Sequence, residues 1–247
     1  MLIVSNWKAY VETLIKAKKL YAVAKHLSAR GVHEIVLAPP APYIGALAPG
    51  NRSNVQFAGQ DVSATPGGAE TGEVTASILR GLGVSYVIVG HSERRVAGDT
   101  DHVVLEKVRH ALAHGLTPIL CVGERTRDAD ATYLTFLRTQ IANVFAALPP
   151  KERAHIVIAY EPVWAIGHSA VDAIGPADLT EMVLYIRKVL SEYLPGKTSQ
   201  KARVLYGGSV EEGNARDLAE GTGIDGFLIG HASTDPVSFT KIVKAIS

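Results

Sequence analysis

Five side chains suited to proton transfer follow short apolar runs of the sequence. Asn6 and Lys8 follow the first run, His91 and Glu93 the fourth, and Glu161 the sixth. A single Glu after an apolar run is usually a solvated loop residue or a member of an ion pair. An amide, an ammonium, an imidazole and carboxylates that meet at the ends of separate strands form a convergent set instead. The residue types therefore predict a site for acid–base chemistry, provided that the fold gathers these strand ends.

The elements that would position these residues alternate regularly along the chain. Several apolar runs are hydrophobic on consecutive positions, as strands covered on both faces are. Eight strands are predicted, at Leu2–Asn6, Glu34–Ala38, Val55–Gln60, Val84–Val89, Thr117–Val122, His155–Tyr160, Ala202–Tyr206 and Gly223–Ile229. Helical spacing lies between them, at Val11–Arg30, Asp101–His114, Ala131–Leu148, Pro176–Tyr193 and Pro236–Ile246.

Parallel strands joined by helices form either a closed barrel or a doubly wound open sheet. Eight units without a GxGxxG after the first strand favour the barrel, although periodicity alone does not settle closure. In a barrel, the residues that perform chemistry lie at the carboxyl ends of the strands, as the five side chains above would. Ala38–Pro42 and Ser63–Gly72 are predicted to be loops, because the alternation resumes after each. We therefore expect one domain over residues 1–247.

Composition limits the class of protein. The chain has 247 residues, of which 47% are hydrophobic and 20% charged, with 25 Lys and Arg against 24 Asp and Glu. No basic block resembles a nucleic-acid or membrane patch, so the expected partner is a small molecule. The single cysteine, Cys121, excludes an intramolecular disulfide and is expected to be a buried packing thiol. With neither a signal-like start nor a long apolar run, we expect a cytoplasmic protein.

Five segments resemble the signature segments of the triosephosphate isomerase family, in that family's order and spacing and across the whole chain. They are Ser5–Lys8, Gly90–Arg95, Cys121–Glu124, Ala159–Gly167 and Tyr206–Val210. The segment Tyr160–Gly167 is very specific, whereas Gly-Gly-Ser is weak alone. The resemblance implies an α/β fold, a single (β/α)8 TIM barrel of eight parallel strands with an outer ring of helices. It also implies a homodimeric isomerase of glycolysis and gluconeogenesis that needs no cofactor or metal.

The resemblance also assigns roles in interconverting dihydroxyacetone phosphate and D-glyceraldehyde 3-phosphate through an enediolate. Glu161 would be the base, and His91 would polarise the carbonyl as a neutral imidazole, an effect already described for this family. Lys8 would supply fixed positive charge, and Asn6 would orient Lys8 and the substrate oxygen. Glu93 would anchor Lys8 or ferry protons, although a Glu at a helix N-terminus has a plain structural explanation.

Phosphate binding needs backbone N–H donors that a ligand can approach closely. By resemblance these donors come from Gly167, Ser209, Gly230 and His231. The segment Pro162–Asp172 resembles the family's lid, whose closure excludes water, again an effect described for this family. Without a ligand, the glycines of these turns would simply allow tight turns.

The chain departs from the family's pattern at three places. His168–Asp172 replaces the usual Thr-Gly-Lys-Thr-Ala of the lid, and His231 stands where a second glycine is usual. Glu70 occupies an aromatic position in the loop Ser63–Glu73, which by resemblance inserts into a second subunit and places Thr71 near the partner's site. A charge there puts the dimer affinity in question.

Two other functions stay open at this point. The changed lid could admit a slightly longer sugar phosphate, and the chain could be a catalytically weak phosphate-binding barrel. The retention of Glu161, His91, Lys8 and Asn6 argues against the second.

Overall fold

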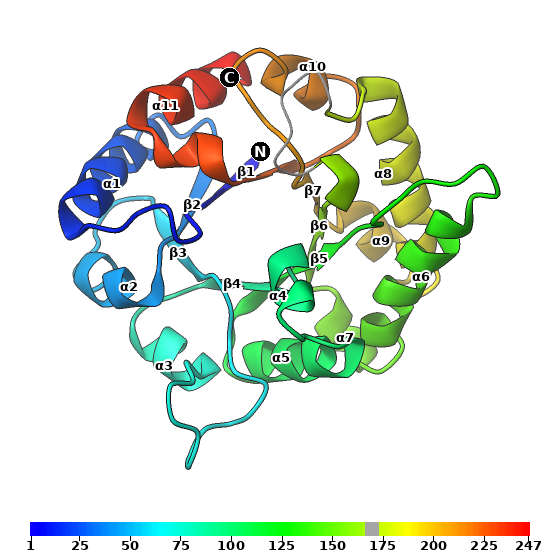
Figure 1. Cartoon of the computed structure of the whole chain (residues 1–247), viewed down its shortest axis with the longest axis horizontal. Helices are drawn as coiled ribbons and strands as arrows, with labels where there is room; N and C mark the ends of the chain where they lie inside the picture. Colours follow the sequence, from blue (N-terminus) through cyan, green and yellow to red (C-terminus); the bar gives the residue numbers. More distant parts are fainter. Residues whose placement is uncertain (166–172) are drawn as a thin grey trace.

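The computed structural model describes residues 1–165 and 173–247, and its eight parallel strands form a closed barrel (Figure 1). Each strand pairs with the next along the chain, and β8 pairs with β1 to close the sheet. The strands are β1 (Leu2–Asn6), β2 (Glu34–Ala38), β3 (Gln56–Gly59), β4 (Tyr86–Val89), β5 (Thr117–Val122), β6 (Val157–Tyr160), β7 (Val204–Tyr206) and β8 (Gly226–Ile229). The prediction of a barrel is confirmed, and the doubly wound sheet is excluded.

Helices surround the barrel on its outside (Figure 1). They are α1 (Leu14–Ser28), α2 (Ala41–Leu47), α3 (Ala76–Gly81), α4 (Ser92–Val96), α5 (Asp101–Ala113), α6 (Thr132–Phe145), α7 (Pro150–Arg153), α8 (Pro176–Ser191), α9 (Lys197–Lys201), α10 (Ala215–Ala219) and α11 (Pro236–Ala245). Two 3₁₀ turns, η1 (Val163–Ala165) and η3 (His231–Thr234), follow β6 and β8. Within residues 1–165 and 173–247, no helix has the length and apolar character needed to cross a membrane.

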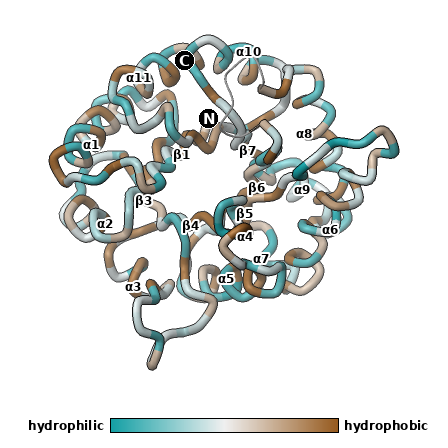
Figure 2. The backbone as a smooth tube through the Cα atoms, viewed as in Figure 1, coloured by the Kyte–Doolittle hydropathy of each residue, from teal (hydrophilic) through white to brown (hydrophobic). Residues whose placement is uncertain are grey.

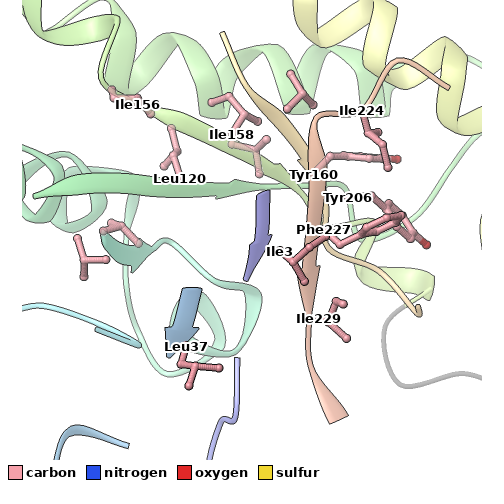
Figure 3. Close-up of a cluster of buried hydrophobic side chains, with 14 of the residues drawn as sticks. Ile3, Leu37, Leu120, Ile156, Ile158, Tyr160, Tyr206, Ile224, Phe227 and Ile229 are labelled. Carbon is pink, nitrogen blue, oxygen red and sulfur yellow. The ribbon is translucent and has the colours of Figure 1, made fainter. Parts of the chain in front are cut away.

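The buried side chains form two layers, one on each face of the sheet. Leu2 and Val4 belong to a cluster made only of strand residues, which fills the barrel, whereas Ile3 belongs to a larger cluster shared with the helices. Figure 3 shows part of that larger cluster, with Ile158 and Phe227 contributed by different strands. Because both faces are covered, the strands are hydrophobic on successive positions, as the colouring of Figure 2 shows.

Three of the predicted strands match the structure, and five begin too early. These five strands begin later in the structure than predicted. β3 begins at Gln56 instead of Val55, β4 at Tyr86 instead of Val84, β6 at Val157 instead of His155, β7 at Val204 instead of Ala202, and β8 at Gly226 instead of Gly223. β3 also ends at Gly59 rather than Gln60. Val84 shows the reason: it is fully buried, but its N–H donates to the Leu79 carbonyl (3.1 Å) in the turn after α3. A hydrophobic pattern reports burial, and burial extends beyond the ladder.

The predicted helices are present, with shorter ends. α1 begins at Leu14 rather than Val11, because the Thr13 hydroxyl accepts a hydrogen bond from the Lys16 N–H (3.2 Å) and caps the helix there. The helices also end before their predicted limits: α1 ends at Ser28 rather than Arg30, α5 at Ala113 rather than His114, α8 at Ser191 rather than Tyr193, and α11 at Ala245 rather than Ile246. α6 spans Thr132–Phe145 rather than Ala131–Leu148. Pro42, predicted in a loop, lies in the first turn of α2, where a missing N–H costs nothing.

Candidate active site

Lys8 lies just beyond the carboxyl end of β1 in a strained backbone conformation. Its φ of 46° is in the left-handed region, which a residue with a Cβ rarely adopts. Two amide side chains hold this turn: the Asn6 Oδ1 accepts from the Lys8 N–H (3.1 Å), and the Gln60 Nε2 donates to the Lys8 carbonyl (2.9 Å). Backbone strain held by surrounding contacts is typical of functional positions. Here it fixes the start of the Lys8 side chain.

The Lys8 ammonium is paired with a carboxylate from another loop. Its Nζ donates to the Glu93 Oε1 over 2.7 Å. The Lys8 side chain is 16% exposed, and that of Glu93 is 59% exposed. Such a partner fits the anchoring role expected for Glu93, with the pair at the solvent boundary of the site.

His91 ends the turn after β4 and is the N-cap of the short helix α4. Its Nδ1 accepts a hydrogen bond from the backbone N–H of Glu93 (3.2 Å). A ring nitrogen that accepts carries no proton, so the neutral imidazole holds its hydrogen on Nε2. That nitrogen lies 3.4 Å from the Glu161 Oε1. The geometry therefore directs the single N–H of His91 toward the carboxylate and the space beside it.

Glu161 follows β6 and is 2% exposed. Its backbone N–H donates to the Val122 carbonyl (2.8 Å), which continues the β5–β6 pairing by one residue. Its Oε2 accepts a hydrogen bond from the Ser92 N–H (3.3 Å), and its Oε1 faces His91. The carboxylate is thus held by one backbone donor and one imidazole, and it lies at the wall of a cavity.

Two glycines leave room for Glu161, and only the structure reveals this. A Cβ on Gly123 would lie 1.8 Å from the Glu161 carbonyl oxygen, and a Cβ on Gly207 would lie 2.8 Å from its Cγ. Both distances are shorter than real Cβ contacts. The plain tight-turn interpretation of Gly207 therefore omits its main role, because its missing side chain is the space that the base occupies.

The loops after β7 and β8 supply the other side of the site. The Ser209 hydroxyl donates to the Ala165 carbonyl (2.9 Å) and so links the β7 loop to η1. Within the described chain, the N–H groups of Gly230 and His231 donate to no backbone carbonyl. The fourth predicted phosphate-binding residue, Gly167, and the altered lid residues 168–172 lie outside the described residues.

A cavity of about 360 Å³ joins these groups. Seven of the predicted site residues line it: Asn6, Lys8, His91, Glu161, Ser209, Gly230 and His231. Glu93 does not line the cavity, but it contacts two residues that do, Lys8 and His91. Tyr10 and Glu211 also line it, and neither was singled out in the sequence. No residue signal pointed to them, since each lies in a loop whose path only the fold determines.

The segment that follows Glu161 is fixed by a buried carboxylate. The Glu124 Oε1 accepts hydrogen bonds from the Trp164 Nε1 (2.9 Å) and the Tyr160 hydroxyl (2.8 Å). The guanidinium of Arg127 contacts the same oxygen (3.1 Å) and stacks on the Trp164 ring. Burial, and next the Glu124 charge, raise the pKa of Tyr160, so its hydroxyl stays a donor. These contacts hold Trp164, three residues after Glu161, in place.

Cys121 lies inside the barrel, as expected for a packing thiol. Burial raises its pKa well above the ordinary value, and the nearby Glu161 charge raises it further. A protonated thiol is a poor nucleophile, so covalent chemistry at Cys121 is disfavoured. Within residues 1–165 and 173–247, no three His, Cys, Asp or Glu side chains come together as a set of metal ligands.

Comparison with known proteins gives one consistent family. The family described as triosephosphate isomerase matches residues 1–246. Among curated relatives, the triosephosphate isomerase of Roseiflexus castenholzii is 40% identical, covering 100% of this chain and 97% of its own length. That of Roseiflexus sp. strain RS-1 is 41% identical (98% and 96%), and that of Streptomyces coelicolor is 37% identical (98% and 96%).

Proposed function

This chain belongs to the triosephosphate isomerase family, and on that premise we propose that it interconverts dihydroxyacetone phosphate and D-glyceraldehyde 3-phosphate, a step of glycolysis and gluconeogenesis. One observation carries the proposal: the Glu161 carboxylate and the His91 Nε2 lie 3.4 Å apart at the wall of a cavity that also contains Lys8. A base and a neutral donor so placed suit removal of a proton beside a carbonyl.

Glu161 is the proposed base. In one direction its carboxylate removes a proton from the carbon that bears the hydroxyl, and the electrons of the broken C–H bond form the enediolate. The hydroxyl proton passes to the former carbonyl oxygen on the side of the cavity lined by His91, and the same carboxyl group returns a proton to the neighbouring carbon, so that the former hydroxyl becomes the new carbonyl. The Ser92 N–H holds Oε2 of the carboxylate, and Oε1 faces the His91 Nε2 at 3.4 Å, beside the cavity.

His91 and Lys8 are the proposed partners of the developing oxyanion. The Nε2–H of a neutral His91 donates to the substrate oxygen, and the Glu93 N–H that occupies Nδ1 favours this tautomer. The Lys8 ammonium adds a positive charge whose position is set by the strained turn and by Glu93. Asn6 supports the same turn and lines the cavity beside them.

We assign the phosphate of the substrate to the loops after β7 and β8. Ser209, Gly230 and His231 line the cavity at this side, and we propose their N–H groups as the donors, with Gly167 completing the set by resemblance. Backbone amides suit an anion because they supply positive dipoles without a side chain that must be ordered first.

A coupled assay tests the proposal directly. The purified chain, given D-glyceraldehyde 3-phosphate without nucleotide or metal, should form dihydroxyacetone phosphate, and activity should survive incubation with a chelator. Erythrose 4-phosphate as substrate distinguishes an isomerase of longer sugar phosphates. No turnover of either substrate, with inorganic phosphate still bound, would leave the weak phosphate-binding barrel. Whole-chain relatives at about 40% identity favour the three-carbon reaction over both.

We further infer a twofold homodimer built through the loop Ser63–Glu73. Residues 68–73 are exposed, and the loop projects from the barrel between β3 and α3 (Figure 1). A projecting loop of this length is costly unless a partner surface covers it. We place the protein in the cytoplasm, where a chain with one buried free thiol needs no oxidising compartment.

A further inference from the structure

His231 brings an imidazole to the side of the cavity that we assign to phosphate. It lines the cavity together with Gly230, the residue directly before it in the chain. A Cβ on Gly230 would lie 3.8 Å from the Lys8 Nζ, so the ammonium lies directly beside this turn. The side chain of His231 is exposed toward solvent rather than packed in the core. A titratable ring and a fixed cation therefore border the same end of the site.

Tyr10 holds the ring of His231 at the cavity. The two rings meet edge to face, with centroids 5.0 Å apart and an interplanar angle of 77°. Tyr10 also lines the cavity, and its backbone is fixed by a bond from its N–H to the Trp7 carbonyl (3.1 Å) and by the Lys16 Nζ on its own carbonyl (3.2 Å). The edge-to-face contact with Tyr10, whose backbone is held in this way, favours this position of the imidazole before any ligand arrives.

Among the described residues, few ionisable groups border the cavity that His231 lines. Besides Lys8, the ionisable side chains that border the cavity are Tyr10, His91, Glu161 and Glu211.

At the junction of η3 and α11, the Asp235 carboxylate accepts from the N–H groups of Val237 and Ser238, and on α11 Lys241 pairs with Glu212 (2.9 Å). An anion that enters beside Gly230 meets a proton on His231 at the same end of the cavity as the Lys8 ammonium, with Glu211 the competing carboxylate on the cavity wall.

We propose that the His231 imidazole is a side-chain ligand of the substrate phosphate, so that protonation of this ring strengthens the binding of dianions. The proposal rests on the proposed function, whose phosphate site it deepens. Histidine is the side chain that gains its charge just below neutral pH, and hydrogen bonds from a charged donor to an anion are about twice as strong as neutral ones. Because the phosphate does not react, the contact acts in ground and transition states alike, and it lowers KM rather than raising kcat.

Sulfate is the probe, because it stays a dianion throughout the pH range in which histidine titrates, whereas phosphate does not. Calorimetry measures its Kd from about pH 8.5 to about pH 5.5 for the unmodified chain, for His231→Gln and for His231→Gly. We expect the affinity of the unmodified chain to rise by about three- to tenfold more than that of either variant. Gln keeps a neutral donor of similar length, so His231→Gln separates the charge from the simple presence of a side chain.

Tyr10 provides the matched pair of controls. Tyr10→Phe keeps the ring contact and should keep the pH dependence, whereas Tyr10→Ala removes the contact and should reduce it. NMR of the His231 ring protons during the sulfate titration reports the protonation directly. Sulfate binding should move these resonances toward those of a protonated ring in the unmodified chain. Equal pH dependence of sulfate affinity in the unmodified chain and in His231→Gln, within about twofold, would overturn the proposal.

The isomerase assay separates this proposal from the function on which it rests. A chain that binds sulfate through His231 but does not isomerise triose phosphates would contradict the proposed function and leave the anion site standing. A chain that isomerises them with the same KM in His231→Gln at both ends of the pH range would keep the function and refute the role of His231.

Discussion

At the scale of single residues, the site depends on how Glu161 is surrounded. The carboxylate is almost fully buried, and it faces the Ser92 N–H, the His91 ring and the space left by Gly207. A buried carboxylate keeps its charge only where donors compensate for lost water. Each of these neighbours therefore affects either the position of the base or its charge.

Glu161→Gln should abolish proton transfer while leaving the cavity intact. Gln has nearly the same shape but cannot accept a proton, so we expect kcat to fall by about 10²- to 10⁴-fold, with KM changed by only a few-fold. Steady-state kinetics in both directions measure this, and thermal unfolding shows whether the variant folds normally. Turnover within a few-fold of the unmodified chain would contradict the role assigned to Glu161.

Gly207→Ala should lower turnover through position alone. The added Cβ would meet the Glu161 Cγ at 2.8 Å and push the carboxylate away, and a displacement of about 1 Å can cost about 100-fold in rate. Gly213→Ala is the matched control, because a Cβ at Gly213 meets nothing within 4 Å. If both variants kept full kcat, the space beside Gly207 would not matter to the base.

At the scale of elements, the two ends of the barrel differ in function: one carries the site and the other a network that links neighbouring strands. The carboxyl ends of the strands carry the site, and the amino ends carry a network around Glu34, the first residue of β2. Its carboxylate accepts hydrogen bonds from the Tyr86 hydroxyl, the Gln56 Nε2 (2.9 Å) and the Arg203 Nη1 (2.8 Å). Gln56 and Tyr86 are the first residues of β3 and β4, so the network joins three neighbouring strands and the start of β7.

The Glu34 network should make stability depend on pH. Burial acts to raise the pKa of Glu34, but the hydrogen bond from Tyr86 and the charge of Arg203 outweigh it and hold the pKa below the ordinary 4.5. A carboxyl group whose pKa is lower in the folded state stabilises the fold fully above the unfolded value, and this contribution is lost as pH falls through the folded value. Glu34→Gln should therefore cost about 1 kcal/mol at neutral pH and progressively less below about pH 4.5.

Urea unfolding from pH 7 to pH 3 tests the Glu34 prediction. Activity at neutral pH provides the control, since Glu34 lies at the end of the barrel opposite the site and kcat should not change. Tyr86→Phe should lose part of the same stability, because burial and then Glu34 raise the pKa of Tyr86 to about 12 and keep its hydroxyl a donor. A difference between the unmodified chain and Glu34→Gln that stays constant down to pH 3 would contradict the assignment.

At the scale of the whole molecule, the projecting loop Ser63–Glu73 is the feature that one chain leaves unexplained. Its ends are tied by a hydrogen bond from the Ser63 N–H to the Val74 carbonyl (2.9 Å), and Gly67, Gly68 and Gly72 take positive φ angles. A defined conformation whose residues 68–73 are exposed suits insertion into a second copy. Glu70 at the exposed tip would then enter an interface, where a carboxylate must find a donor or stay at the wet rim.

We predict a homodimer that dissociates on dilution, with specific activity falling in parallel. Sedimentation and activity measured over one dilution series test this. Glu70→Phe provides the comparison, because an apolar tip needs no buried donor, and the dimer of that variant should persist to lower concentration. A monomer with full specific activity would show that the loop serves another purpose.

The sequence by itself determined the eight-unit alternation and the residues at the strand ends. Both are local: a strand covered on two faces needs consecutive apolar residues, and a residue that follows a strand is found beside it in any parallel barrel. The sequence alone therefore predicted that four residues meet at one end of the barrel: Asn6, Lys8, His91 and Glu161.

Only the tertiary structure decided the contacts that depend on closure of the barrel. Three such contacts join segments far apart in the chain: Gly207 leaves space for Glu161, Tyr10 lies against His231, and Glu34 pairs with Arg203. No periodicity encodes such pairs, because periodicity reports which face of an element is buried and not which atoms it meets there. The early strand starts share this cause, since burial at Val84 and Val55 continues where ladder pairing has not begun.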